Sequence, residues 1–290
     1  MKQKRSDIIA TFSIVAHDPA TGEWGVAVQS KFLGVGAVVP WAKAGVGAVA
    51  TQAFANPAYG PEGLGLLEQG LSASEVVERL TSKDPHSEDR QVGIIDSKGR
   101  SASFTGENCY DWAGGKAGTN YAAQGNILVN KETVTAMGET FEKAQGSLAD
   151  RLLAAIKAAQ NAGGDSRGKQ SAALLVVKDQ AGYGGLSDVA VDLRVDDHPE
   201  PIEELDRIYQ LQQLYFGASE DSDVVEINEE LKEEVANRLQ HFQYLSKGEV
   251  SDDEFHEALT TYLHTENFEG REQKRGYIDL KVYEFMKKQT

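Results

Sequence analysis

The chain has 290 residues and a mass of 31.5 kDa, with 40% hydrophobic and 26% charged residues, a balance that excludes a disordered or fibrous protein. Its 29 basic and 45 acidic side chains give a net charge of −16, which argues against nucleic acid or an anionic membrane surface as a partner. The single cysteine, Cys109, excludes an internal disulfide and a zinc site made of several thiolates.

The first ten residues, 1–10, form an extension ahead of the first predicted strand. This stretch begins with basic residues but lacks the long apolar core of a secretory signal. We therefore expect the chain in the cytoplasm. No apolar run of the sequence approaches the ~20 residues that a membrane helix needs.

Residues 11–216 are predicted to form a domain of strands and helices. Short β-rich runs joined by turn residues predict strands, and apolar residues three or four apart predict helices. The expected strands are 11–16, 24–29, 35–39, 46–51, 91–96, 101–105, 121–129, 171–177 and 189–195. The expected helices are 61–80, broken at Gly70 and Ser72, 131–162, broken at Gly146, and 201–216.

The order of these elements predicts an α+β fold. Consecutive strands joined by short turns are typical of antiparallel sheets, here packed between helical layers. A doubly wound parallel sheet would need a helical crossover between strands. The sequence contains neither a G-x-G-x-x-G turn nor a Walker loop, and its six histidines form no metal-binding motif. We therefore predict no cofactor and no metal.

Charge and glycine content both change near residue 200. Residues 200–290 contain 22 acidic and 10 basic side chains, a net charge of 10 − 22 = −12, and four of the 29 glycines. The small and acidic stretch 217–224 is predicted to be a linker. Residues 225–290 are predicted to form a separate helical domain, with helices near 231–242, 251–263 and 278–286.

Five segments of the first domain have a distinctive sequence: TFSIVAHDPATGEWGVAVQSKF (11–32), VGAVVPWAKAGVGAVATQAFANPAYGPEGL (35–64), QGNILV (124–129), GGDSRGKQSAALLVV (163–177) and VDLRVDDHPEPIEEL (191–205). They resemble a prokaryotic family of domains of unknown function that is placed among the N-terminal-nucleophile (Ntn) hydrolases. The resemblance covers roughly residues 11–210. It implies a four-layer αββα sandwich of two antiparallel sheets, and it does not supply a substrate.

The resemblance implies that Thr11 is a catalytic nucleophile. In Ntn hydrolases the first residue of the mature chain attacks an amide carbonyl, and its own α-amine, with a pKa near ~8, takes up the proton. Here Ala10 precedes Thr11, and a peptide nitrogen cannot act as that base. Three interpretations stay open: residues 1–10 are removed, translation starts later, or the chain keeps the fold without the chemistry, with Thr11 a β-branched residue that opens a strand.

Similarity to proteasome-type sites implies a lysine about thirty residues after the nucleophile. Lys43 has that spacing, and Lys31 is the alternative, although a solvated surface lysine is the simpler interpretation of either. The acid that such sites place on the second strand is absent, because Gln29 and Ser30 occupy the corresponding positions.

Further site residues are expected to bind the substrate or to stabilise an oxyanion. The glycine-rich turn before residue 171 presents Asp165, as a catalytic candidate, and Ser166, unless this turn only ends the preceding helix. The remaining candidates for substrate binding or oxyanion stabilisation are Gln29, Ser30, Lys31, Gln52, Asn56, Gly125 and Asn126.

Residues 226–290 resemble a peptidoglycan-binding module that is often appended to the same family. The resemblance implies a cell-wall fragment as a possible ligand, although tyrosines in so small a domain are commonly core residues. We expect an amidohydrolase that cleaves a small amide or peptide-like substrate and that forms a homo-oligomer. The alternative is an inactive Ntn-fold binding or assembly component, whose C-terminal domain engages a glycan, a peptide or a partner protein.

Overall fold

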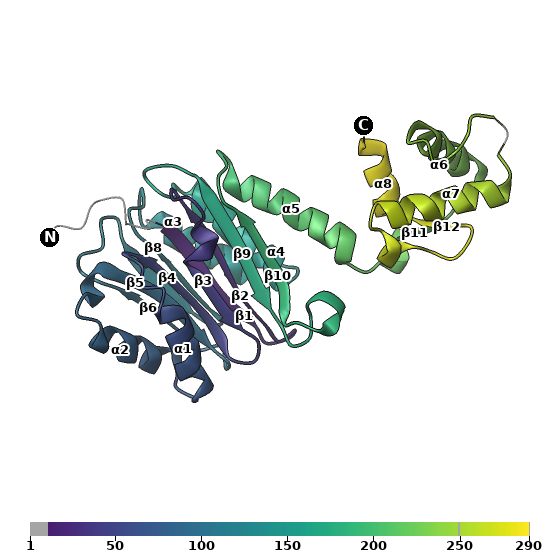
Figure 1. The fold of residues 1–290 in the computed structure, drawn as a ribbon. Coiled ribbons are helices and arrows are strands. Elements are labelled where there is room, and N and C mark those ends of the chain that lie inside the picture. Colours follow the sequence, from purple (N-terminus) through teal and green to yellow (C-terminus); the bar gives the residue numbers. More distant parts are fainter. Residues whose placement is uncertain (1–10, 249, 290) are drawn as a thin grey trace. The chain divides into compact units, whose positions relative to one another are not determined.

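The structure, a computed structural model, describes residues 11–248 and 250–289. The chain divides into two compact units, and the boundary falls between Arg207 and Ile208, inside helix α5 (Pro201–Phe216). The expected mixed fold with antiparallel sheets is confirmed (Figure 1). Within the described residues no helix has the length and apolarity that a membrane crossing requires.

The larger sheet of the first unit has six strands in the order β10-β9-β2-β1-β8-β7, and each neighbouring pair is antiparallel. The predicted N-terminal hairpin is confirmed, with Thr11 opposite Ser30 and Asp18 opposite Glu23. The strands are β1 (Thr11–Asp18), β2 (Glu23–Ser30), β7 (Gly114–Gly118), β8 (Tyr121–Gly125), β9 (Ser171–Val177) and β10 (Val189–Val195).

The smaller sheet has four antiparallel strands in the order β3-β4-β5-β6. Its inner side chains pack against those of the larger sheet in a shared core that includes Val15, Val26, Ala48 and Ile95. The strands are β3 (Pro40–Lys43), β4 (Gly47–Ala53), β5 (Arg90–Asp96) and β6 (Ser101–Thr105).

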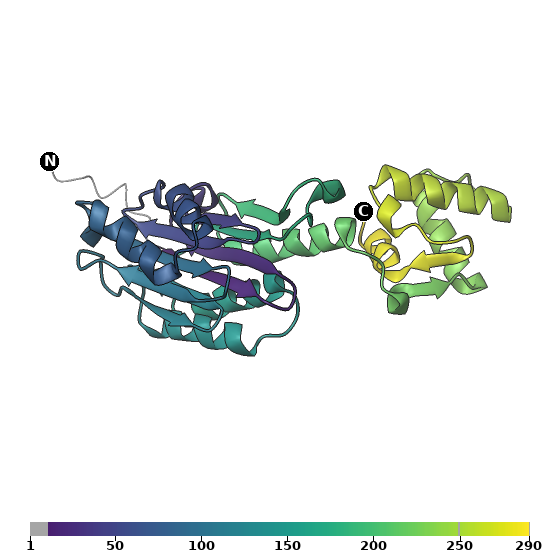
Figure 2. The ribbon, with the colours of Figure 1, turned by 90° about the horizontal axis from the view of Figure 1, so that it is seen from below.

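Helices cover the outer faces of both sheets (Figures 1 and 2). Helices α1 (Tyr59–Glu68) and α2 (Ala73–Lys83) pack against the four-stranded sheet, and α3 (Glu132–Lys143) and α4 (Leu148–Asn161) pack against the six-stranded sheet. Capping boxes at Ser72 and Ser147 begin α2 and α4. The two predicted helix breaks are therefore confirmed.

Two sequence expectations for the first unit were wrong, and one strand was missed. The expected strand 35–39 contains a 3-10 helix, Val35–Ala37, because Gly34 has a φ of 66° and turns the chain before β3. The expected strand 121–129 ends at Gly125, since Ile127 has a φ of 53°. Strand β7 was not expected, because its sequence, GGKAG, has no strand-forming side chain.

The second unit contains helices α6 (Glu229–His241), α7 (Asp252–Thr265) and α8 (Leu280–Lys288) around one apolar core. A short antiparallel pair, β11 (Val224–Glu226) and β12 (Tyr277–Asp279), was not predicted. The acidic stretch 217–224 is held to this pair, because Ser219 Oγ donates to Asp279 Oδ2 at 2.5 Å.

Candidate functional site

Strand alternation places the Thr11 side chain between the two sheets. Successive residues of a strand point to opposite faces, and Val15 of β1 packs with Ala48 of β4 in the core between the sheets. Ser13 and Thr11 lie two and four residues before Val15 and share its face. Accordingly, Ser13 Oγ donates to Gln52 Oε1 of β4 at 2.6 Å, and Thr11 is fully buried.

At the Thr11 end of the strands the layer between the sheets is polar. Gln91 Oε1 accepts hydrogen bonds from Gln52 Nε2 at 2.7 Å and Asn126 Nδ2 at 3.0 Å, and Gln91 Nε2 donates to Gly125 O at 2.8 Å. Gln124 Nε2 donates to Ser13 Oγ at 2.7 Å. The residues of this inter-sheet polar cluster are all at most 1% exposed: Thr11, Ser13, Ser30, Gln52, Gln91, Gln124 and Asn126.

Some polar atoms of the cluster lack a partner. Thr11 Oγ1, Gln124 Oε1 and Asn126 Oδ1 have no hydrogen-bond partner among the described residues. A buried polar atom left unpaired costs about 1–3 kcal/mol, and such atoms in a native protein call for an explanation. One hydroxyl and two side-chain amide oxygens left unpaired in one buried layer are consistent with a site that binds a polar ligand.

Four of the expected substrate-binding residues gather around Thr11. Thr11 O accepts hydrogen bonds from Asn126 N at 3.0 Å and Gln52 Nε2 at 3.3 Å, Ser30 lies opposite Thr11 in the ladder, and Gly125 precedes Asn126. The Gln52 side chain and the backbone N–H of Asn126 therefore hold the backbone of Thr11 in place. Asn126 Oδ1, in contrast, is buried without a hydrogen-bond partner among the described residues.

Asp165 lies in the same region but is fully engaged. Its buried carboxylate accepts hydrogen bonds from Arg167 Nε at 3.1 Å, Arg167 Nη2 at 2.9 Å and Lys31 N at 3.0 Å. Asp165 therefore ties the chain that leaves β2 to the turn after α4. Ser166 is exposed, and the Lys31 amine donates to Lys169 O at 3.3 Å, so neither is directed at Thr11.

Lys43 is not brought to Thr11. It lies opposite Gly47 at the turn between β3 and β4 and forms an ion pair with Glu68 of α1. Gly47 is five strand residues from Gln52, a distance of about 17 Å at ~3.4 Å per residue. The sequence spacing that selected Lys43 therefore does not correspond to proximity in the fold, and we assign it no catalytic role.

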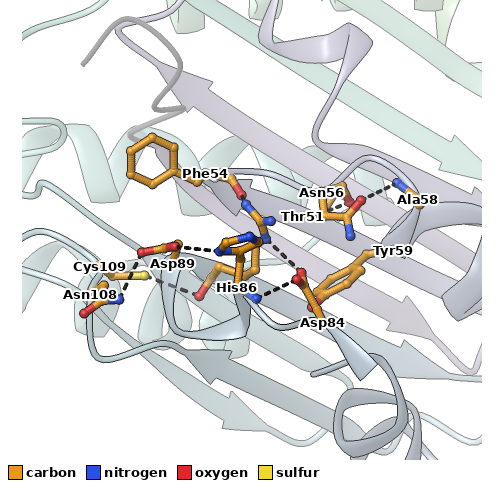
Figure 3. Close-up of polar contacts among 11 residues, drawn as sticks. Thr51, Phe54, Asn56, Ala58, Tyr59, Asp84, His86, Asp89, Asn108 and Cys109 are labelled. Atoms are coloured by element: carbon orange, nitrogen blue, oxygen red, sulfur yellow. Dashed lines mark hydrogen bonds and ion pairs between the residues drawn. The ribbon is translucent and has the colours of Figure 1, made fainter. Parts of the chain in front are cut away.

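Asn56 and Gln29 form no hydrogen bond with Thr11 among the described residues. Asn56 Oδ1 accepts from Ala58 N at 3.2 Å at the start of α1 (Figure 3). Gln29 shares the outer face of β2 with Gly25, where a Cβ atom would lie 2.7 Å from Leu152 of α4. Gln29 therefore faces the helices. Its amide is buried there without a hydrogen-bond partner among the described residues.

A second polar group adjoins the site at the start of β5 (Figure 3). Arg90 Nε donates to Asp84 Oδ2 at 2.9 Å, Arg90 Nη1 to Phe54 O at 2.5 Å, and Tyr59 OH to Asp84 Oδ2 at 3.1 Å. Burial alone would raise the pKa of Asp84, but hydrogen bonds from Arg90, His86 N and Tyr59 hold it below its usual value. Burial and this carboxylate raise the pKa of Tyr59. The group fixes the loop between β4 and α1.

Cys109 lies beside this group and is a poor nucleophile. Its thiol donates to Arg90 O at 3.3 Å, and burial, the largest influence, raises its pKa to about 11. The thiol therefore stays protonated near neutral pH. Within the described ranges no group of three or more His, Cys, Asp and Glu side chains is placed to hold a metal ion.

Sequence analysis missed the centre of the polar cluster. Ser13, Gln91 and Gln124 were not singled out, and neither was Arg167. A usable signal was present, because polar residues at every second position of a buried strand, as in T-x-S at Thr11 and Q-x-N at Gln124, mark a polar face.

Comparison with known proteins identifies the first unit. Residues 11–205 match the family model described as "Family of unknown function (DUF1028)". A solved structure, protein SPO2555 from Silicibacter pomeroyi, also assigned to DUF1028, is 33% identical, with a TM-score of 0.65, over 72% of this chain and 91% of that chain. Anbu (ancestral β-subunit) from Yersinia bercovieri is 10% identical, with a TM-score of 0.32, over 69% of this chain and 94% of that chain.

The second unit has a match of its own. Residues 215–286 match the model described as "Putative peptidoglycan binding domain", which confirms the resemblance seen in the sequence. No curated protein matches the chain.

Proposed function

Because the chain belongs to the DUF1028 family, whose matched region begins at Thr11, we propose that its first unit is an Ntn-type amidohydrolase with Thr11 as nucleophile. The observation that carries this proposal is the Thr11 hydroxyl, which is buried between two sheets and unpaired among the described residues. The pairing of helices α1 and α2 with one sheet, and α3 and α4 with the other, supports the αββα sandwich of such enzymes.

The proposed reaction requires that Thr11 be the first residue. Its free α-amine takes the hydroxyl proton while Oγ1 attacks the amide carbonyl of a small amide or peptide-like substrate. The amine then returns a proton to the leaving nitrogen, which departs and leaves an ester on Thr11. A water molecule, deprotonated by the same amine, hydrolyses that ester and restores the hydroxyl. We expect the side chains of Ser30 and Asn126, which adjoin Thr11, to contact the substrate.

Substitution of Thr11 tests the proposal. Residues 11–290, expressed behind a single methionine that is removed before threonine, are assayed against a panel of small amides and dipeptides. We expect Thr11→Ala to lower turnover at least about a thousandfold, Thr11→Ser to retain part of it, and the exposed control Thr135→Ala to retain all of it. Equal turnover by Thr11→Ala and the parent chain would exclude this mechanism.

A second candidate function is binding without hydrolysis. It is favoured by the positions of Lys31 and Lys43, which do not support Thr11, and by the hydrogen bonds that fully engage Asp165. We propose that the second unit binds cell-wall fragments, in line with its family match. Soluble fragments are the form that a protein in the cytoplasm, where we expect this chain, would encounter. Such binding should survive Thr11→Ala unchanged.

A further inference from the structure

The second unit contains a groove of about 490 Å³ between α7 and residues 271–279. Its size suits a small ligand or a short stretch of peptide. Leu259, Leu263 and Ile278, each at most 5% exposed, contribute apolar lining. Lys274 and Tyr277 line the side formed by the loop and β12.

Polar contacts join the two walls of the groove at both ends. Arg275 Nη2 donates to Asp253 Oδ1 of α7 at 2.5 Å. Glu272 accepts from Thr260 Oγ1 at 3.2 Å and forms a 2.8 Å hydrogen bond with His264 Nε2. Beneath them, Arg271 Nη1 donates to Asp279 Oδ2 at 2.7 Å in a pair that is almost completely buried. The groove is thus formed before any ligand binds.

Lys274 gives the groove a positive group that is not neutralised. Residues 200–290 have a net charge of −12, and the arginines of the groove, Arg271 and Arg275, are each paired with an aspartate. Lys274 Nζ instead lies 4.1 Å from the centre of the Tyr277 ring, with no carboxylate within ion-pair distance among the described residues. In a unit this acidic, an ammonium group that has no carboxylate partner is suited to bind the carboxylate of a ligand.

We infer that this groove binds the peptide part of a cell-wall fragment, a short peptide whose free carboxylate contacts Lys274. The inference rests on the proposed binding of such fragments by the second unit. Leu259, Leu263 and Ile278 form an almost buried apolar floor, and the polar residues Thr260 and Gln273 also line the groove. Sugar binding relies on open aromatic faces, whereas the Tyr277 ring, the single Phe, Tyr or Trp ring in the described lining, is covered on one face by Lys274.

Calorimetric titration of the full chain tests this inference with four probes: a disaccharide-peptide, its stem peptide L-Ala-γ-D-Glu-diaminopimelate, the same peptide with its carboxylates amidated, and the peptide-free disaccharide. We expect the first two to bind with similar affinity. The amidated peptide should bind at least about tenfold more weakly, because a charge-assisted contact is lost. The disaccharide should show no heat of binding.

Variants of Lys274 complete the test. Lys274→Met should weaken peptide binding about tenfold, Lys274→Arg should keep it within about threefold, and the exposed control Lys288→Met should leave it unchanged. If the disaccharide binds as tightly as the disaccharide-peptide, the groove does not recognise peptide, although fragment binding stands. If none of the probes binds, the proposed fragment binding and the inference both fall. Unchanged peptide affinity in Lys274→Met would refute the contact.

Discussion

Replacing Gln91 by methionine should destabilise the first unit strongly while leaving its shape unchanged. Methionine has nearly the volume of glutamine but makes none of its hydrogen bonds. The substitution removes the acceptor of Gln52 Nε2 and Asn126 Nδ2 and the donor to Gly125 O, all within a fully buried layer. Two or three groups left unpaired at about 1–3 kcal/mol each predict a loss of roughly 2–9 kcal/mol.

The measurement is urea unfolding followed by tryptophan fluorescence, which reports on the first unit because Trp24, Trp41 and Trp112 all lie there. The control is Gln69→Met, since Gln69 is exposed at the end of α1 and its amide donates only to Gly65 O; we expect a change within about 0.5 kcal/mol. A loss below about 1 kcal/mol for Gln91→Met would refute the hydrogen-bonded cluster.

Two further predictions concern the thiol and the second unit. Because burial raises the pKa of Cys109 to about 11, alkylation at pH 8 should be about a hundredfold slower than in the urea-unfolded chain; equal rates by mass spectrometry would contradict its burial. Arg271→Met should cost the second unit about 3–5 kcal/mol, because it leaves Asp279 buried without its cation. Burial alone would raise the pKa of Asp279, but hydrogen bonds, including those from Ser219 and Arg271, hold it below its usual value. The stability that this ion pair contributes is therefore complete above about pH 4 and is lost as the pH falls further. The destabilisation caused by Arg271→Met, measured by hydrogen exchange, should accordingly become smaller in acid. A destabilisation that stays constant from pH 7 to 3 would argue against the pair.

Elements specified by local signals could be predicted from the sequence. The turn at 18–22 determines the first hairpin, and Ser72, Ser147 and Ser251 each begin a helix with a capping box. Strand β7 escaped prediction, because its glycines carry no side chains and it forms only through its pairing with β8.

The site was predictable only in part, because tertiary structure brings its members together. Thr11 was found through the resemblance, but Gln91 and Gln52 are 39 residues apart, and Gln124 and Ser13 are 111 apart. Spacing along the chain suggested Lys43, but in the β3–β4 register this residue lies at the turn of the hairpin, at the opposite end of β4 from Gln52. Side-chain direction depends on register in the same way, which explains why a given position on a strand can face the site or the helices.

The central claim is that Thr11 acts as an N-terminal nucleophile, and it requires a free amine on that residue. The most direct measurement is the intact mass of the full-length protein, with N-terminal sequencing after prolonged incubation. The account predicts a chain that begins at Thr11. If the cleavage is autocatalytic, the Thr11→Ala variant should keep residues 1–10. A chain that still carries residues 1–10 would keep the Thr11 nitrogen in a peptide bond and would contradict hydrolysis in favour of binding.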